Sequence, residues 1–182
     1  VPFTQKADVY VINTCSVTNM ADRKSRQMLH KAKKNNPDSI VVAAGCYVQT
    51  SEKEVLNDLS VDIVIGNDRK HDLVRLLEEY SLDSVNDTVD DINDGKHDFE
   101  ELFIDQTKEH TRAFIKVQDG CNQFCSYCII PYARGRVRSR RFENVIAEVE
   151  RLAANGFKEV VLTGIHLSSY GVDFEEAIGL LE

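Results

Sequence analysis

The chain has 182 residues, of which 42% are hydrophobic and 29% are charged, as in a soluble globular chain of one domain or two small ones. It has no run of about 18 apolar residues, which excludes a transmembrane helix, and no basic-then-apolar leader, so we expect a cytoplasmic protein. The net charge of −8 arises from residues 81–110, which hold ten of the 30 acidic residues and two of the 22 basic ones. Because the rest of the chain is neutral, the acidic composition does not exclude an anionic partner.

Residues 1–80 alternate between apolar runs and helical segments. Strands are predicted at 8–13, 40–44 and 61–65, and helices from about Asn19 to Asn35, from Ser51 (with Glu54, a capping-box pattern) and from Asp68 to about Tyr80. This order predicts an α/β fold, with a small parallel-sheet amino-terminal domain over 1–80. Cys15 and Cys46 each follow a strand, at the carboxyl edge where such sheets carry their chemistry. If the two strands are neighbours, the two thiols are neighbours too.

The second half of the chain begins with a change of composition. We expect an acidic linker at 81–110, rich in Ser, Asn and Asp over 81–98, and a second domain at 111–182. Its predicted elements are a strand at 113–120, a helix from Phe142 to Asn155, a strand at 158–164 and a helix from Asp173 to Glu182. These are the first βα units of a barrel that normally takes about 200–250 residues. We therefore expect an incomplete barrel, whose open strand edges favour association, in a chain that begins at Val1 because it was processed or cut.

The five cysteines are an odd number in a chain without an export signal, which favours metal or redox chemistry over a disulfide framework. Three of them, Cys121, Cys125 and Cys128, have the spacing C-x3-C-x2-C and follow a predicted strand. Iron–sulfur clusters usually take four cysteines, so a loop that offers three would leave one iron open for a non-protein ligand. Zinc prefers a closed set of four ligands, often in C-x2-C pairs, and remains an alternative. From spacing alone, Cys15 and Cys46 are either ligands or buried core residues.

The motif C-x3-C-x2-C, with an aromatic residue at Tyr127, resembles the signature of radical S-adenosylmethionine enzymes. The longer string GCNQFCSYCIIPYARGRVRSR is similar to the methylthiotransferases of that superfamily. Three further strings, VINTCSVTNMADRKSRQ, AAGCYVQ and VVLTGIHLSSYG, resemble other segments of the same family, in the same order. The resemblance extends from residue 8 to residue 171 and implies an amino-terminal α/β domain followed by the first βα units of an incomplete radical S-adenosylmethionine barrel.

The resemblance also implies cofactors and ligands. Cys121, Cys125 and Cys128 would bind a [4Fe–4S] cluster, and S-adenosylmethionine would bind its open iron beside Tyr127 and Gly164. Cys15 and Cys46 would be two of the three ligands of an auxiliary [4Fe–4S] cluster, whose third cysteine lies upstream in the family and is missing here. No residue is assigned as catalytic, and His166 and Tyr170 are pocket or surface residues.

Five arginines stand between the cysteine motif and the next predicted helix: Arg134, Arg136, Arg138, Arg140 and Arg141. In an extended segment the first four would share one face, which could bind phosphates or the cofactor carboxylate, or pair with acidic residues. A solvated or internally paired face is the alternative.

The family's substrates are a modified adenosine at position 37 of tRNA or an aspartate of a ribosomal protein. The string LTGIHLSSYG is most similar to the branch that acts on N6-threonylcarbamoyladenosine, which implies tRNA as partner and an electron donor such as flavodoxin or ferredoxin. The alternatives are the isopentenyladenosine or ribosomal branch, another radical enzyme, and a non-enzymatic iron–sulfur or zinc module that binds RNA.

Overall fold

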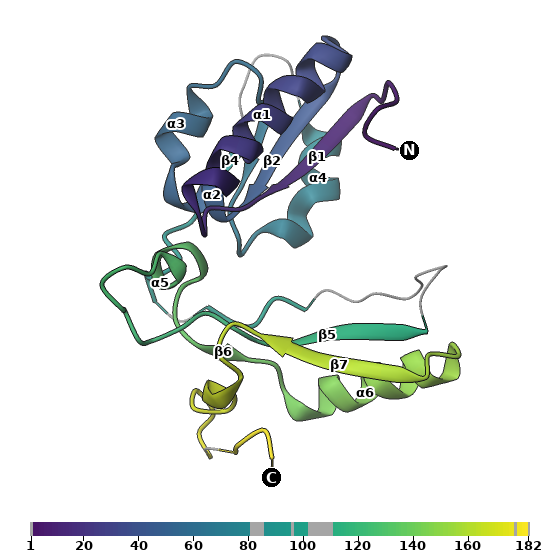
Figure 1. The fold of residues 1–182 in the computed structure, drawn as a ribbon, viewed down its shortest axis with the longest axis vertical. Helices are drawn as coiled ribbons and strands as arrows, with labels where there is room; N and C mark the ends of the chain where they lie inside the picture. The colour runs from purple at the N-terminus through teal and green to yellow at the C-terminus, as the bar shows by residue number, and fades with distance from the viewer. Residues whose placement is uncertain (1, 81–85, 96, 102–110, 177, 182) are drawn as a thin grey trace. The chain divides into compact units, whose positions relative to one another are not determined.

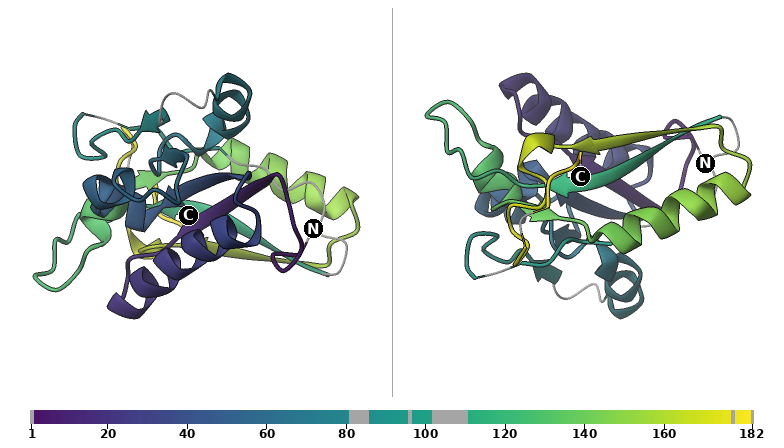
Figure 2. Two further views of the ribbon diagram at one scale, coloured as in Figure 1. Left: turned by 90° about the horizontal axis from the view of Figure 1, so that it is seen from above. Right: turned by 90° about the horizontal axis from the view of Figure 1, so that it is seen from below.

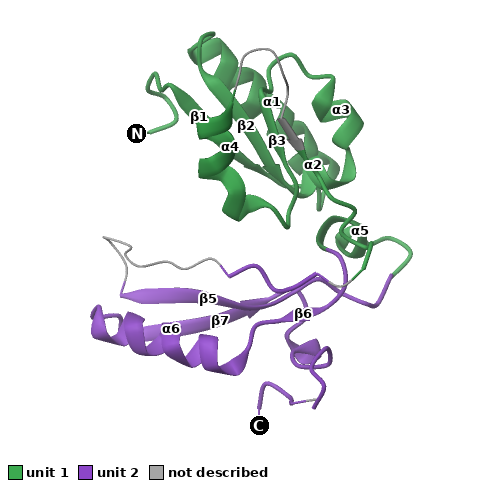
Figure 3. Ribbon diagram, turned by 180° about the vertical axis from the view of Figure 1, so that it is seen from behind, with its two compact units in different colours: residues 1–95, 125–134 green, residues 96–124, 135–182 purple. Residues whose placement is uncertain are grey.

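The structure is a computed structural model that describes residues 2–80, 86–95, 97–101, 111–176 and 178–181. The chain divides into two compact units, shown in different colours in Figure 3. Unit 1 comprises residues 1–95 and 125–134, and unit 2 comprises residues 96–124 and 135–182. In the described part of the chain, no helix is long and apolar enough to cross a membrane.

Unit 1 contains a parallel sheet with the strand order β1-β2-β3-β4 (Figure 1). Its strands are β1 (Val9–Thr14), β2 (Ile40–Gly45), β3 (Ile63–Ile65) and β4 (Asn86–Thr88). Its helices are α1 (Asn19–Asn35), α2 (Cys46–Thr50), α3 (Glu52–Leu56), the 3₁₀ turn η1 (Lys70–Asp72), α4 (Leu73–Glu79) and α5 (Ile130–Arg134). The predicted parallel α/β fold is therefore confirmed.

The central strand β2 is buried on both faces, which explains its unbroken apolar run. On one face, Val41 and Ala43 pack with Leu29 of α1 and Val55 of α3. On the other face, the core consists of residues from β2, β3 and α4: Val42, Ala44, Ile63, Ile65 and Leu76. Figure 1 shows α1 and α4 on opposite sides of the sheet. Helix α1 begins at the predicted residue because the side chain of Thr18 accepts a hydrogen bond from the Ala21 amide.

Unit 1 differs from the sequence predictions at three places. Helix α2 begins directly at Cys46, whereas the next helix was predicted to begin at Ser51. Helix α3 does follow Ser51, but no side-chain hydrogen bond caps it, and the Glu54 carboxylate accepts from the Tyr47 hydroxyl at 3.2 Å instead. The strand β4 lies inside the predicted linker and pairs with β3, so the compact unit continues to Gly95. Residues 81–85, 96 and 102–110 of that linker lie outside the described residues.

Unit 2 is built on β5 (Arg112–Asp119), which pairs in parallel with β7 (Glu159–Gly164) and antiparallel with the short β6 (Arg138–Ser139). The helix α6 (Phe142–Ala154) covers one face of this sheet (Figure 2). The core here consists of Ile115 and Val117 of β5 with Val145 and Leu152 of α6. The predicted strand–loop–helix–strand order is therefore confirmed.

The helix predicted from Asp173 to Glu182 is wrong for the described residues of that segment, none of which is helical. Only the 3₁₀ turn η2 (Leu167–Ser169) follows β7 among them. Asp173, the expected first residue of the helix, instead accepts two hydrogen bonds from Ser139, from its amide at 2.8 Å and its hydroxyl at 2.5 Å. Because the Asp173 side chain is bonded to Ser139 of β6, it does not cap a helix at this position.

Candidate functional site

The three-cysteine segment leaves β5 through a tight turn. Gly120 has a φ of +70°, and the Cys121 amide donates to the Gly135 carbonyl at 3.0 Å, so the two arms of the segment close on each other. A second turn joins Cys125 and Cys128, because the Cys128 amide donates to the Cys125 carbonyl at 2.9 Å. Cys125 is exposed, and Cys121 and Cys128 are half-buried. Among the described residues, no three His, Cys, Asp or Glu side chains are gathered as a metal site.

The donor set of this segment nevertheless fits an iron–sulfur cluster. Between Gly120 and Arg134 the only candidate metal ligands of the His, Cys, Asp and Glu types are the three thiols. Thiolates select zinc or iron–sulfur clusters, and a closed zinc site needs a fourth protein ligand that this segment does not supply. Tyr127, expected beside the cofactor, is 90% exposed. These residues could hold a cluster that keeps one iron open.

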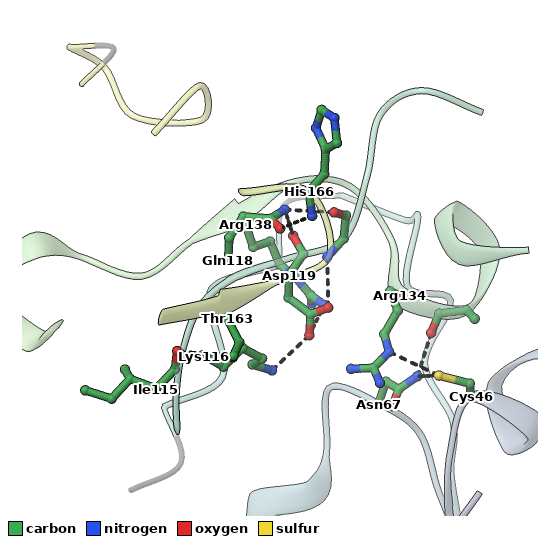
Figure 4. Close-up of polar contacts among 12 residues, drawn as sticks. Cys46, Asn67, Ile115, Lys116, Gln118, Asp119, Arg134, Arg138, Thr163 and His166 are labelled. Atoms are coloured by element: carbon green, nitrogen blue, oxygen red, sulfur yellow. Dashed lines mark hydrogen bonds and ion pairs between the residues drawn. The ribbon is translucent and has the colours of Figure 1, made fainter. Parts of the chain in front are cut away.

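The base of the segment is held by a polar network at the end of β5 (Figure 4). The carboxylate of Asp119 accepts from the Gly120 amide at 2.9 Å and forms an ion pair with Lys116 at 2.9 Å. Arg138 of β6 lies 4.0 Å from the same carboxylate. Sequence reasoning missed Asp119, although an acidic residue at the end of a predicted strand was visible in the sequence.

Gly164 ends β7 and lies close to the side chains of Leu167 and Gln118. A Cβ atom there would lie 2.9 Å from Leu167 Cδ2 and 3.0 Å from both Cβ and Oε1 of Gln118. A larger residue at this position would therefore require the side chains of Leu167 and Gln118 to shift, whatever the role of Gly164 toward a cofactor.

Of the two residues left unassigned after β7, Tyr170 has a structural contact. It is buried, and its hydroxyl donates to the Arg140 carbonyl at 2.8 Å. Burial, and then the charges of Glu143 and Asp173, raise the pKa of Tyr170, which keeps the hydroxyl protonated as a donor. His166 contacts Ser169 through its ring, with 2.6 Å between Nδ1 and the hydroxyl oxygen.

The predicted neighbourhood of Cys15 and Cys46 is supported by the strand register. Thr14 of β1 pairs with Gly45 of β2, so each cysteine directly follows one member of a pair. Cys15 is exposed and borders a mainly apolar hollow of about 410 Å³, whereas Cys46 is 3% exposed. Two thiols at adjacent strand ends match part of a cluster's donor set and leave it incomplete among the described residues.

The Cys46 sulfur lies in a polar environment inside unit 1, as Figure 4 shows. The Nε of Arg134 donates to it at 3.1 Å, and the Asn67 amide nitrogen lies 3.7 Å away. The same amide donates to the Ala133 carbonyl at 2.5 Å, and Asn93 donates to the Pro131 carbonyl at 3.1 Å. These two bonds anchor α5 to the rest of unit 1. Sequence spacing gave no sign of this arrangement, which joins residues far apart in the chain.

We expect Arg134→Ala to increase the alkylation rate of Cys46 several-fold, because uncovering a buried sulfur should increase its reaction more than losing a charge that favours the thiolate decreases it. The rate would be measured on the folded chain with iodoacetamide and peptide mass spectrometry, with exposed Cys125 as internal reference. Arg136→Ala is the matched control, since Arg136 lies over the Phe124 ring at 4.4 Å. An unchanged or slower reaction in Arg134→Ala would contradict this assignment.

The prediction that the arginine strip forms one face is wrong. Arg134 belongs to a helix, Gly135 turns the chain with a φ of +73°, and only Arg138 and Ser139 are extended as a strand. Arg140 is 2% exposed and forms ion pairs with Glu101 and Glu148. The alternative of internal pairing therefore holds for Arg140.

Comparisons with known proteins agree with this organisation. Residues 1–66 match the family model described as uncharacterized protein family UPF0004, and residues 115–181 match the radical SAM superfamily. A solved structure of the radical S-adenosylmethionine methyltransferase TsrM from Kitasatospora setae is similar with a TM-score of 0.56 and 17% identity, over 91% of this chain and 38% of that one. At this identity the likeness supports the fold alone.

Curated relatives are similar over almost the whole chain. The threonylcarbamoyladenosine tRNA methylthiotransferases MtaB of Aquifex aeolicus and Bacillus subtilis are 48% and 44% identical over 95% and 96% of this chain. A tRNA-2-methylthio-N(6)-dimethylallyladenosine synthase of a Thermoanaerobacter species is 37% identical over 96% of the chain. The chain spans 42%, 39% and 38% of the lengths of these relatives. With its UPF0004 segment followed by a three-cysteine radical SAM segment, the chain is similar over almost its whole length to tRNA methylthiotransferases.

Proposed function

We propose that the protein represented by this chain adds a methylthio group to carbon 2 of N6-threonylcarbamoyladenosine at position 37 of tRNA. The observation that carries the proposal is the graded similarity to the two tRNA branches. Three relatives named for threonylcarbamoyladenosine are 41–48% identical to the chain, whereas those named for dimethylallyladenosine are 35–37% identical.

The radical SAM and UPF0004 segments imply S-adenosylmethionine and iron–sulfur clusters as cofactors. We assign Cys121, Cys125 and Cys128 to a [4Fe–4S] cluster whose open iron binds the amino and carboxylate groups of S-adenosylmethionine, near Tyr127 and Gly164. Cys15 and Cys46 are assigned to an auxiliary cluster that needs a further ligand. When bound, these cofactors supply reductive cleavage of S-adenosylmethionine, removal of hydrogen from carbon 2 of the adenine and insertion of a methylated sulfur.

The chain's own residues orient the three-cysteine segment and place a charge beside the Cys46 sulfur. Asp119 and the positive φ of Gly120 set the direction in which the three-cysteine segment leaves β5. The contact between Arg134 and Cys46 places a positive charge beside a sulfur that would carry negative charge as a ligand. tRNA is the proposed substrate, and a reductant such as flavodoxin or ferredoxin is the proposed electron donor.

The proposal is tested first by iron, sulfide and absorbance after anaerobic reconstitution. We expect about four irons and four sulfides at the three-cysteine segment, with a visible spectrum that changes when S-adenosylmethionine is added. Cys125→Ala should abolish this cluster because two thiols remain on the segment. Cys15→Ala is the matched control and should retain it, since Cys15 lies in another segment.

Other outcomes separate the alternatives. Zinc, or five free thiols and no metal, would contradict the radical reaction for this chain and favour a binding module. The branch is tested by incubating the reconstituted protein with S-adenosylmethionine, reductant and tRNA that carries either modified adenosine, followed by nucleoside mass spectrometry. Methylthiolation of isopentenyladenosine alone would replace the proposed substrate.

A further inference from the structure

Gln118 is a fully buried polar residue near the end of β5, with 0% of its surface exposed. Its amide nitrogen donates to the carbonyls of Asp119 and Gly120, both at 2.8 Å, and its Oε1 accepts from the His166 amide at 2.7 Å. Figure 4 shows this side chain between the two backbone segments. Three hydrogen bonds account for a burial that would otherwise be costly.

These bonds join the two segments that leave the carboxyl ends of the parallel strands β5 and β7. The Gly120 carbonyl directly precedes Cys121, and the His166 amide lies two residues after Gly164. Gln118 also forms one wall against Gly164, where a Cβ would lie 3.0 Å from its Oε1. One side chain therefore fixes the start of the three-cysteine segment relative to the segment after β7.

We infer that Gln118 is a positioning residue that holds Cys121 and the backbone around Gly164 in the arrangement needed to bind the cluster and S-adenosylmethionine together. The inference rests on the proposed function, because it requires a cluster at the three-cysteine segment. Gln118 touches neither reacting group and acts through the backbone that it bonds.

Two substitutions separate the hydrogen bonds from the volume of the side chain. Gln118→Met fills similar space and removes all three hydrogen bonds. Gln118→Glu keeps an acceptor for the His166 amide but, when ionised, faces the Asp119 and Gly120 carbonyls without a donor. Thr163→Val is the matched control, because its hydroxyl donates to the Ile115 carbonyl at 3.1 Å, within the same pair of strands.

The experiment measures iron release from the reconstituted chain to a ferrous chelator, with and without S-adenosylmethionine, and the electron paramagnetic resonance spectrum of the reduced cluster. We expect both Gln118 variants to release iron about tenfold faster or more, and the spectral change caused by S-adenosylmethionine to weaken. Thr163→Val should behave as the wild type does. Far-ultraviolet circular dichroism of each apo variant checks that it is folded.

The possible failures are distinguishable. A wild-type chain that binds no cluster contradicts the proposed function, and the inference with it. A wild-type cluster with Gln118 variants that match Thr163→Val overturns the inference and leaves the proposed function intact. If both variants fail to fold, hydrogen exchange of the wild-type chain decides: the His166 amide should be protected, and exchange as fast as in an unfolded peptide would overturn the inference.

Discussion

Gly120→Ala is expected to destabilise unit 2 and to prevent the three-cysteine segment from holding iron. The new Cβ would overlap the Arg136 carbonyl oxygen and lie 2.5 Å from the Arg136 carbonyl carbon, in a backbone with a φ of +70°. Relief requires movement of the turn at Gly120 or of the chain at Gly135, which are linked through the Cys121 amide. The cost should exceed the roughly 1–2 kcal/mol of a left-handed alanine alone. The measurements are urea unfolding by circular dichroism and iron content after reconstitution.

Gly156→Ala separates the steric effect from the backbone effect. Gly156 has a φ of +91°, similar to that of Gly120, but a Cβ there would meet nothing within 4 Å. This variant should lose only about 1–2 kcal/mol and keep its iron. Equal effects of the two substitutions would show that contact with the Arg136 carbonyl is unimportant.

Arg140→Met is expected to lower the free energy of unfolding by about 3–5 kcal/mol, because it leaves the buried Glu148 carboxylate with only the longer, 3.7 Å contact to Arg151. The Arg140 side chain is 2% exposed, bonds Glu148 directly and lies 2.6 Å from Glu101, whose exposure is 28%. These contacts join the residue that follows β6 to α6 and to the chain before β5. Because the sequence contains no Trp, unfolding would be followed by circular dichroism, with hydrogen exchange of α6 to locate the loss.

A second substitution tests whether charge is the cause. Glu148 is 4% exposed, so removing its charge in Arg140→Met/Glu148→Gln should recover much of the stability. Glu148→Gln alone should destabilise, since it leaves Arg140 with the more exposed Glu101. If the double variant is as unstable as the sum of the single ones, lost packing rather than an uncompensated charge explains the effect.

The sequence predicted those elements whose signals are local. Helix α1 was placed correctly, and in the structure Thr18 and Asn36 bound it. The strand β2 was placed correctly because a buried parallel strand is apolar throughout. The strand β4 has the sequence Asn-Asp-Thr and no apolar pattern. It is a strand through its backbone pairing with β3, which no local pattern reveals.

The candidate site was predictable only in its residue types. Spacing identified the three thiols, and the order of strands placed Cys15 beside Cys46. The contact between Arg134 and Cys46 joins residues 88 positions apart, and Gln118 bonds His166 across 48 positions. Such contacts depend on how strands and turns meet in the folded chain. For the arginine strip, the sequence predicted an arrangement that does not form. The even spacing of charges was interpreted as an extended face, although a helix and a turn interrupt the segment.

The two compact units are interleaved along the chain. Unit 1 takes residues 1–95, and its last helix, α5, comes from residues 125–134, after the chain has already entered unit 2. During synthesis from the amino end, residues 1–95 emerge without this helix. The Cys46 sulfur therefore lacks its Arg134 donor until the three-cysteine segment has itself been made. The Asn67 amide lacks the Ala133 carbonyl for the same period. The order of translation thus leaves the Cys46 sulfur without this hydrogen-bond donor for a limited period in the life of each new chain.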